Sequence, residues 1–258
     1  WWDYGYWITT LSDRTTIADN ATLNDWQIKK IAYSLITTPQ NSWHIFNSHY
    51  TEDVSEFLGE ENIIDWGNES YEDYLLRQEE EIASGESELC EAISATDAMK
   101  LDVEPKSCFP VGAGLDSDYI VIFVAGERIA IPDSDLFFYN LDGGGDESKK
   151  HWLIKISNHE QSKFLENDAM TPNSYFMENS TLGKLIPFSI FKYVEPNSGR
   201  AFDQYQHGLI PIYVKHVKYS DSENDPFYLV YASPSFYSDI PGAMTTVLIY
   251  KINPDYTP

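Results

Sequence analysis

Apolar residues in the first third of the chain recur with helical spacing. Leu23–Ile36 carries Trp26, Ile31 and Leu35 with roughly helical spacing. A proline cannot continue a helix, so Pro39 separates it from a second short helix over Asn41–Tyr50. Two more helices are predicted, over Glu52–Leu58 and over Ser70–Ala83, the second with a solvated acidic face. The chain therefore begins as a mainly helical structure.

The pattern changes after these helices. From Gly85 to Ser117 the periodicity weakens among Gly, Ser, Pro and acidic residues, which indicates an irregular insertion. Tyr119–Ala125 is continuously apolar, as expected of a strand buried on both faces, and Arg128–Ile131 is its predicted hairpin partner. Beyond Pro187, turns separate four predicted strands: Ser189–Val194, Ile210–Tyr219, Phe227–Ala232 and Thr246–Ile252.

Helices followed by strands, without βαβ alternation, predict an α+β fold. We expect four segments along the chain. They are a helical core, first part, at 1–58, an insertion at 59–118, the second part of the core at 119–186, and a small β-rich peripheral unit at 187–258. The first core segment contains the opening motif of the chain.

The composition narrows the possible partners. The chain has 41 acidic and 17 basic residues, a formal net charge of −24, so it would repel nucleic acid. Such a surface is common in salty or extracellular media and does not identify a substrate. No run of 18 apolar residues and no signal segment is present. Because the chain opens abruptly on aromatic residues, we expect it to be a piece of a longer protein.

Cysteine, histidine and asparagine positions add weaker signals. Cys90 and Cys108 could form a disulfide, and two buried free thiols are an equal alternative. The six histidines lack the spacing of a zinc site, so we predict no metal bound by this chain. N-x-[ST] sequons make three asparagines glycosylation candidates: Asn20, Asn68 and Asn179.

The first six residues form the densest chemical cluster. They contain two indole N–H donors, two phenols and one carboxylate, which suit binding of a hydroxyl group or a sugar. Clustered aromatic residues are also common in ordinary cores, and that alternative stays open on composition alone. The cluster consists of Trp1, Trp2, Asp3, Tyr4, Gly5 and Tyr6.

The WWDYG sequence at 1–5 resembles the signature of the archaeal oligosaccharyltransferase catalytic subunit (AglB family). Asp13–Thr16 and Ala18–Thr22 extend the resemblance. It implies that Trp1, Trp2 and Asp3 bind the Ser/Thr hydroxyl of an acceptor sequon, within an acceptor-binding motif completed by Tyr4 and Gly5. It further implies that Tyr6 approaches a lipid-linked donor.

A second resemblance is to the DK motif of the same family. Asp146, Lys149, Leu153 and Ile156 stand at its offsets of zero, three, seven and ten. On a regular α-helix these positions span an arc of about 80°. The glycines before Asp146 signal a helix start, where its carboxylate could cap free N–H groups. An ordinary amphipathic helix is the alternative, and Leu153 stands where the family usually has Met.

The resemblance implies a membrane enzyme that transfers glycan from a dolichyl-phosphate-type lipid to Asn in N-x-S/T sequons. The expected partners are sequon-containing polypeptides, lipid-linked oligosaccharide and the protein's own transmembrane domain, with this domain on the extracytoplasmic side. Mn²⁺ or Mg²⁺ would be bound outside this chain, so the isolated chain is predicted to be inactive. The rival hypothesis is a free-standing extracellular glycan-binding module.

Overall fold

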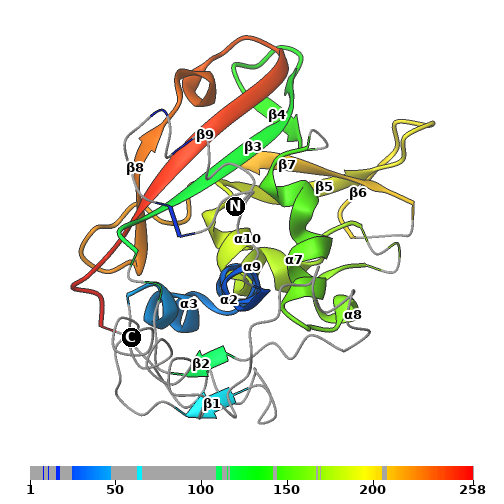
Figure 1. Ribbon diagram of the computed structural model, residues 1–258. Helices are drawn as coiled ribbons and strands as arrows, with labels where there is room; N and C mark the ends of the chain where they lie inside the picture. The colour runs from blue at the N-terminus through cyan, green and yellow to red at the C-terminus, as the bar shows by residue number, and fades with distance from the viewer. Residues whose placement is uncertain are drawn as a thin grey trace. The chain divides into compact units, whose positions relative to one another are not determined.

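The computed structural model (Figure 1) describes about two thirds of the chain, which divides into two compact units. One unit comprises residues 1–34 and 41–118, and the other comprises residues 35–40 and 119–258. Each unit is described by itself. The residues described are 8, 11, 16–17, 25–47, 63–65, 109–111, 115, 117–141, 144–166, 168, 170–204 and 208–257.

Two helices account for most of the described part of the first unit. The first predicted helix is confirmed as α2 (Asp25–Ile36). The second is α3 (Pro39–Phe46), which begins at the proline because a first helical position needs no backbone N–H donor. Tyr33 of α2 and Ile45 of α3 belong to one buried cluster, against which Leu115 packs. The Leu115 N–H also donates to the Ile45 carbonyl at 2.6 Å.

A short parallel pair of strands lies in the predicted insertion. β1 (Ile63–Asp65) pairs with β2 (Phe109–Val111). Within 85–117, where the sequence predicts an inserted or irregular unit, the three residues of β2 form regular ladder pairs. The helices predicted over 52–58 and 70–83 lie outside the described residues.

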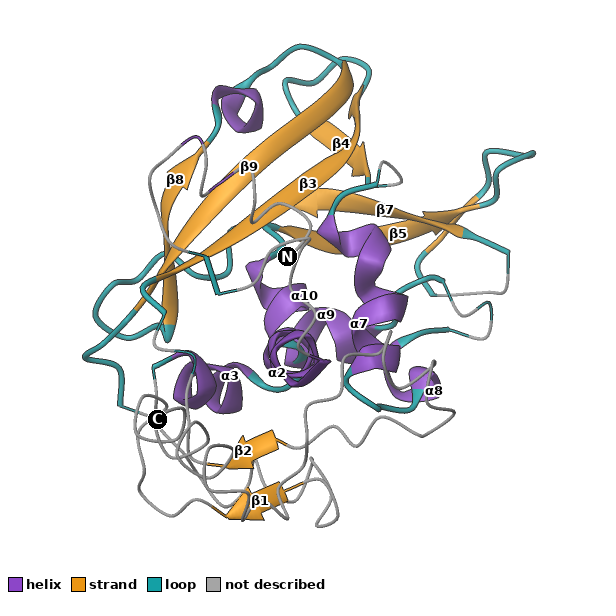
Figure 2. Ribbon diagram, viewed as in Figure 1, coloured by secondary structure: helices purple, strands orange, loops and turns teal. Residues whose placement is uncertain are grey.

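One sheet of seven strands organises the second unit, with the order β6-β5-β7-β4-β3-β9-β8 and antiparallel pairing at every neighbour (Figure 2). Strands from both sides of residue 187 join this one sheet, and with the helices they confirm the α+β class. The strands are β3 (Tyr119–Ala130), β4 (Phe137–Asn140), β5 (Phe188–Val194), β6 (Ala201–Phe202), β7 (Ile210–Lys215), β8 (Phe227–Ala232) and β9 (Gly242–Ile252).

The long strand β3 corrects two predictions. Arg128 and the residues beside it continue β3, so they are not its hairpin partner; that partner is β4, beyond the turn at 131–136. Gly126 sits inside the strand because a Cβ there would lie 2.1 Å from the Asn140 carbonyl oxygen. Burial is also one-sided: Ile122 is buried and Phe123 only half-buried. A continuous apolar run occurs both in strands buried on two faces and in strands buried on one, so the run alone did not distinguish them.

The remaining strands match the predicted ones with shifted ends. β8 agrees at both ends, β7 ends at Lys215 and not at Tyr219, and β9 begins four residues before Thr246. Apolar periodicity predicts that a strand exists more reliably than it predicts where the strand ends, because the hydrogen-bond ladder can continue through polar residues.

Short helices pack beside the sheet in the second unit (Figure 2). Asn173 caps α9 by accepting a hydrogen bond from the Phe176 N–H, and Ser180 caps α10 through the Gly183 N–H. The phenol of Tyr250 on β9, fully buried, donates to the Leu185 carbonyl at 2.7 Å and ties α10 to the sheet. The helices are the 3-10 helix η3 (Asp146–Lys149), α7 (Lys150–Ile156), α8 (Gln161–Phe164), α9 (Ser174–Asn179), α10 (Thr181–Leu185) and the 3-10 helix η4 (Pro234–Tyr237).

Candidate functional site

The DK-type segment begins as a 3-10 helix and continues as an α-helix. Its first turn is the 3-10 helix η3, and the rest is the α-helix α7. Residues three apart eclipse one another in a 3-10 helix, so Asp146 and Lys149 stack, and their charged groups lie 3.7 Å apart. With this tighter first turn the four motif positions span an arc of about 60°, narrower than a uniform α-helix would give.

The motif residues differ in exposure. Leu153 is 1% exposed, whereas Lys149 and Ile156 are half-buried. The neighbouring Trp152 is 52% exposed, and its ring lies 4.8 Å from the His151 ring and 5.9 Å from Lys155 Nζ. The helix therefore combines a fully buried position with two that reach the surface.

The start of this helix is packed directly onto β3. Gly145 is the N-cap residue, and a Cβ on it would lie 2.7 Å from both the Phe123 carbonyl oxygen and the Ala125 nitrogen. Real Cβ contacts of that length are essentially absent, so only glycine fits. This close approach explains why the last of the three consecutive glycines, Gly145, has to be a glycine.

Asp146 bonds to the sheet. β4 pairs with β3 only from Glu127 onward, so the backbone N–H of Phe123 lies beyond the reach of that strand. Asp146 Oδ2 accepts this N–H at 2.7 Å, which satisfies a donor that burial would otherwise penalise. The predicted helix start is confirmed, because Asp146 is the first residue of η3, and the N-cap position itself is held by Gly145.

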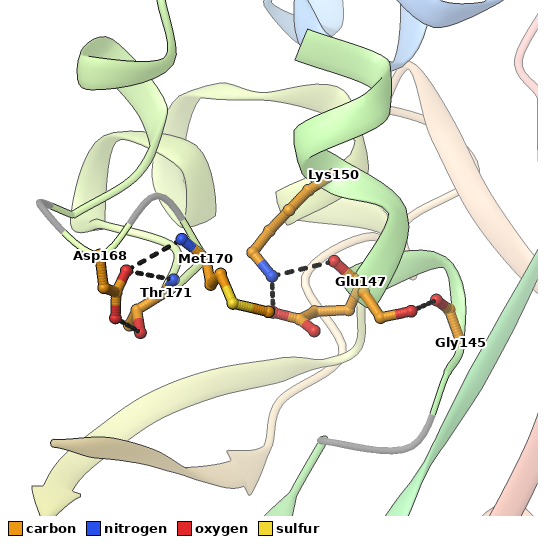
Figure 3. A network of polar contacts seen from close by, with 7 residues as sticks. Gly145, Glu147, Lys150, Asp168, Met170 and Thr171 are labelled. Carbon is orange, nitrogen blue, oxygen red and sulfur yellow. Dashed lines mark hydrogen bonds and ion pairs between the residues drawn. The ribbon is translucent and has the colours of Figure 1, made fainter. Parts of the chain in front are cut away.

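A second pair of charges lies inside the protein at the junction of η3 and α7 (Figure 3). Lys150 Nζ lies 2.9 Å from Glu147 Oε1 and also donates to the Glu147 carbonyl at 3.2 Å. Glu147 is 7% exposed and Lys150 is 5% exposed. Removing either partner of such a buried pair strongly destabilises the folded protein, because the other charge is then buried without a partner.

Tyr213 of β7 completes this network. Its side chain hydrogen-bonds that of Glu147, and it is 1% exposed. Burial, followed by the nearby charge of Glu147, raises the pKa of Tyr213 well above its usual value, so the phenol stays protonated and can donate. The helix start is thus bonded to two different strands, β3 through Asp146 and β7 through Glu147.

The loop after α8 has its own carboxylate. Asp168 accepts the backbone N–H groups of Met170 and Thr171 at 2.9 and 2.8 Å, and the Thr171 hydroxyl at 2.6 Å (Figure 3). These bonds fold the chain back so that Leu165 and Pro172 pair as a bridge. Asp168 therefore shapes a turn.

Metal binding finds no support among the described residues. In that part of the chain no three His, Cys, Asp or Glu side chains gather as a metal site would require. Likewise, none of its helices is long and apolar enough to cross a bilayer.

Several predicted site residues lie outside the described residues. They are Trp1, Trp2, Asp3, Tyr4, Gly5, Tyr6, Asn20, Asn68, Cys90 and Cys108. Asn179 is described: it is exposed at the end of α9, and its side chain donates to the Tyr175 carbonyl at 3.3 Å.

Sequence reasoning did not identify Glu147, Lys150 or Tyr213. The opposite charges three residues apart in Glu147 and Lys150 were a usable signal. Nothing local marks Tyr213, because its contact with the helix depends on the order of the strands in the sheet.

Comparison with known proteins gives short matches. No family model matches the chain. It is 42% identical over 48 residues to the dolichyl-diphosphooligosaccharide–protein glycosyltransferase subunit STT3A of Oryza sativa subsp. japonica, which covers 19% of this chain and 6% of that protein. It is 32% identical over 75 residues to subunit STT3 of Saccharomyces cerevisiae, covering 29% and 10%. The chain thus matches a tenth or less of these relatives, and the matches support the oligosaccharyltransferase family.

Proposed function

We propose that this chain is the extracytoplasmic domain of an archaeal-type membrane oligosaccharyltransferase. The full enzyme transfers glycan from a dolichyl-phosphate-type lipid to Asn in N-x-S/T sequons. One observation carries the proposal: the chain that opens with WWDYG also contains a DK-type segment whose four motif positions lie on one helical face. The similarity to two glycosyltransferase subunits supports it.

Acceptor recognition is the role we assign to both motifs. Trp1, Trp2 and Asp3 hydrogen-bond the hydroxyl of the sequon Ser or Thr. A site built for a hydroxyl rejects analogues without it, because its own polar groups would then stay unpaired. Tyr4 and Gly5 complete the motif, and Tyr6 approaches the lipid-linked donor.

The DK-type helix contributes the apolar part of acceptor recognition. Lys149 and Ile156 reach the surface and contact the threonine side chain, while the buried Leu153 supports them from inside. Leucine has a branched side chain, whereas methionine is unbranched and more flexible. The helical face that contains Leu153 is therefore stiffer than one containing Met.

The divalent cation of the full enzyme, Mn²⁺ or Mg²⁺, is bound outside this chain in our proposal. The two carboxylates at the helix start do not fit a metal site. Asp146 accepts the Phe123 N–H, and Glu147 is engaged by Lys150 and Tyr213. This domain therefore contributes positioning of the acceptor, which can lower a barrier substantially by fixing reactant geometry.

The decisive experiment is Asp3→Ala in the membrane-embedded enzyme with an Asn-x-Thr peptide as acceptor. We expect kcat/KM to fall by about 100-fold or more, because the hydroxyl loses a charged acceptor. Asp239→Ala, which removes an exposed carboxylate, is the matched control and should leave transfer unchanged. Near-normal transfer by the Asp3 variant would refute the assignment, and the isolated chain should transfer no glycan.

A free-standing glycan-binding module is the second candidate, favoured by exposed aromatic side chains that could stack on sugars. Besides Trp152, Phe191 is 53% exposed, and its ring stacks on that of Phe138 at 5.1 Å. This hypothesis predicts measurable glycan affinity in the isolated chain. Hydrophobic spans upstream in the parent gene would favour the transferase, and a simple signal peptide there would favour the module.

A further inference from the structure

The buried pair of Glu147 and Lys150 needs an explanation beyond stability. Removing two charges from water costs several kcal/mol per ion, and apolar residues of similar volume are often as stable in such places. In this protein the pair sits at the residue where the 3-10 turn changes to an α-helix, with both acceptors of Lys150 supplied by Glu147. The pair therefore fixes the winding of the helix at one point.

Two anchors at consecutive residues fix the rotation of the helix about its axis. Asp146 is bonded to the backbone of β3, and Glu147 is bonded to the Tyr213 phenol of β7. Side chains on successive residues of a 3-10 helix point about 120° apart, so the two bonds act in different directions. A helix held by only one of them could rotate and carry its surface residues with it.

Rotation would displace the residues to which we assign acceptor contact. Lys149 lies between Glu147 and Lys150 in the same turn, and Leu153 follows one turn later. Leu153 is 1% exposed in a close-packed interior, so a small rotation would change its packing. Fine discrimination of one methyl group requires that this helical face does not move.

We infer that Glu147, Lys150 and Tyr213 are positioning residues for sequon recognition, acting through the helix that carries Lys149, Leu153 and Ile156. The inference rests on the proposed function. None of the three touches the acceptor. They hold one face of the DK-type helix in the orientation that distinguishes threonine from serine at the sequon.

Tyr213→Phe in the membrane-embedded enzyme tests the inference, because it removes only one oxygen. The readout is the ratio of kcat/KM for Asn-x-Thr and Asn-x-Ser peptides. We expect the ratio to fall by about fivefold, with the loss appearing mainly in KM of the threonine peptide. The control is Tyr250→Phe, which removes an equally buried phenol hydrogen bond at α10 and should lower thermal stability without changing the ratio.

An unchanged ratio in the Tyr213 variant would overturn the inference, as would an equal fall in both variants, which would indicate general loosening. If Tyr213→Phe does not fold, the double variant Glu147→Gln/Lys150→Met decides, since it removes both charges and leaves neither unpaired. An unchanged ratio there also refutes the inference. Failure of the proposed function is recognised separately: the unaltered enzyme would then use Asn-x-Ala peptides as well as Asn-x-Thr peptides.

Discussion

Gly145 shows how one missing side chain allows a helix to approach a strand. The backbone at this position lies against Phe123 and Ala125 of β3, closer than any Cβ tolerates. The hydrogen bond from the Phe123 N–H to Asp146 depends on the same approach. The glycine and the aspartate thus act together at the level of single residues.

Gly145→Ala should lower the free energy of unfolding by about 2–3 kcal/mol, because a backbone has to move to admit the methyl group. Gly144→Ala is the matched control: its φ of +85° strains alanine, but no atom lies within 4 Å of the added Cβ. That variant should cost about 1 kcal/mol. Urea denaturation of both variants measures the difference, and equal costs would contradict the packing explanation.

His159 makes stability depend on pH. Burial, then the charge of Lys163, lowers its pKa below the usual value of about 6.5. Between these two pKa values the unfolded chain binds more protons than the folded chain, so stability is lost as pH falls below about 6.5. We expect the unfolding temperature of His159→Gln to depend less on pH between 7.5 and 5 than that of the unaltered chain. His216→Gln, at an exposed histidine, should behave like the unaltered chain.

At the scale of elements, Arg128 connects the end of β3 to the loop that contains η4. Its guanidinium is buried and donates to the carbonyls of Ser235 and Ile240, at 2.6 Å each. Lys215 donates to the Phe236 carbonyl at 2.7 Å. Two cations from separate strands thus hold one loop through its backbone.

Arg128→Met should release this loop, because the carbonyls of Ser235 and Ile240 lose the donor that ties them to β3. Hydrogen exchange of the amides in residues 235–240 is expected to accelerate by about tenfold or more. The amides of α10, which Arg128 does not contact, report whether the whole unit loosens. Arg200→Met, at an exposed turn, is the control. Unchanged exchange in the loop would show that Phe236, buried in the core, is sufficient to hold it.

Sequence patterns predicted elements where local chemistry decides and missed them where distant pairing decides. Helix α2 and strand β8 follow from apolar spacing and were found. The hairpin partner of β3 was misplaced, since residues 128–130 and β4 both have strand-forming composition and only the turn distinguishes them. Motif spacing predicted that Lys149, Leu153 and Ile156 share one helical face, and η3 and α7 place them so. The 3-10 turn and the contact with Tyr213 arise from packing, which spacing does not encode.

At the scale of the whole second unit, the sheet joins distant parts of the chain. Residues 119–128 of β3 pair with residues 242–251 of β9, and β9 in turn is the neighbour of β8. Pairing across so long a loop carries a closure cost before its contacts form, and this cost slows folding. Stopped-flow refolding should accordingly show the main phase in milliseconds to seconds; a microsecond phase that recovers full native signal would contradict this.

The late position of β9 also matters while the chain is being made. Until β9 emerges from the ribosome, β3 and β8 lack the neighbour they share, and their unpaired edges can join to other chains. A chain that stops at residue 240 should therefore associate into large particles, which light scattering would detect. During synthesis these edges therefore stay open to association until residue 252 has emerged and is free to pair.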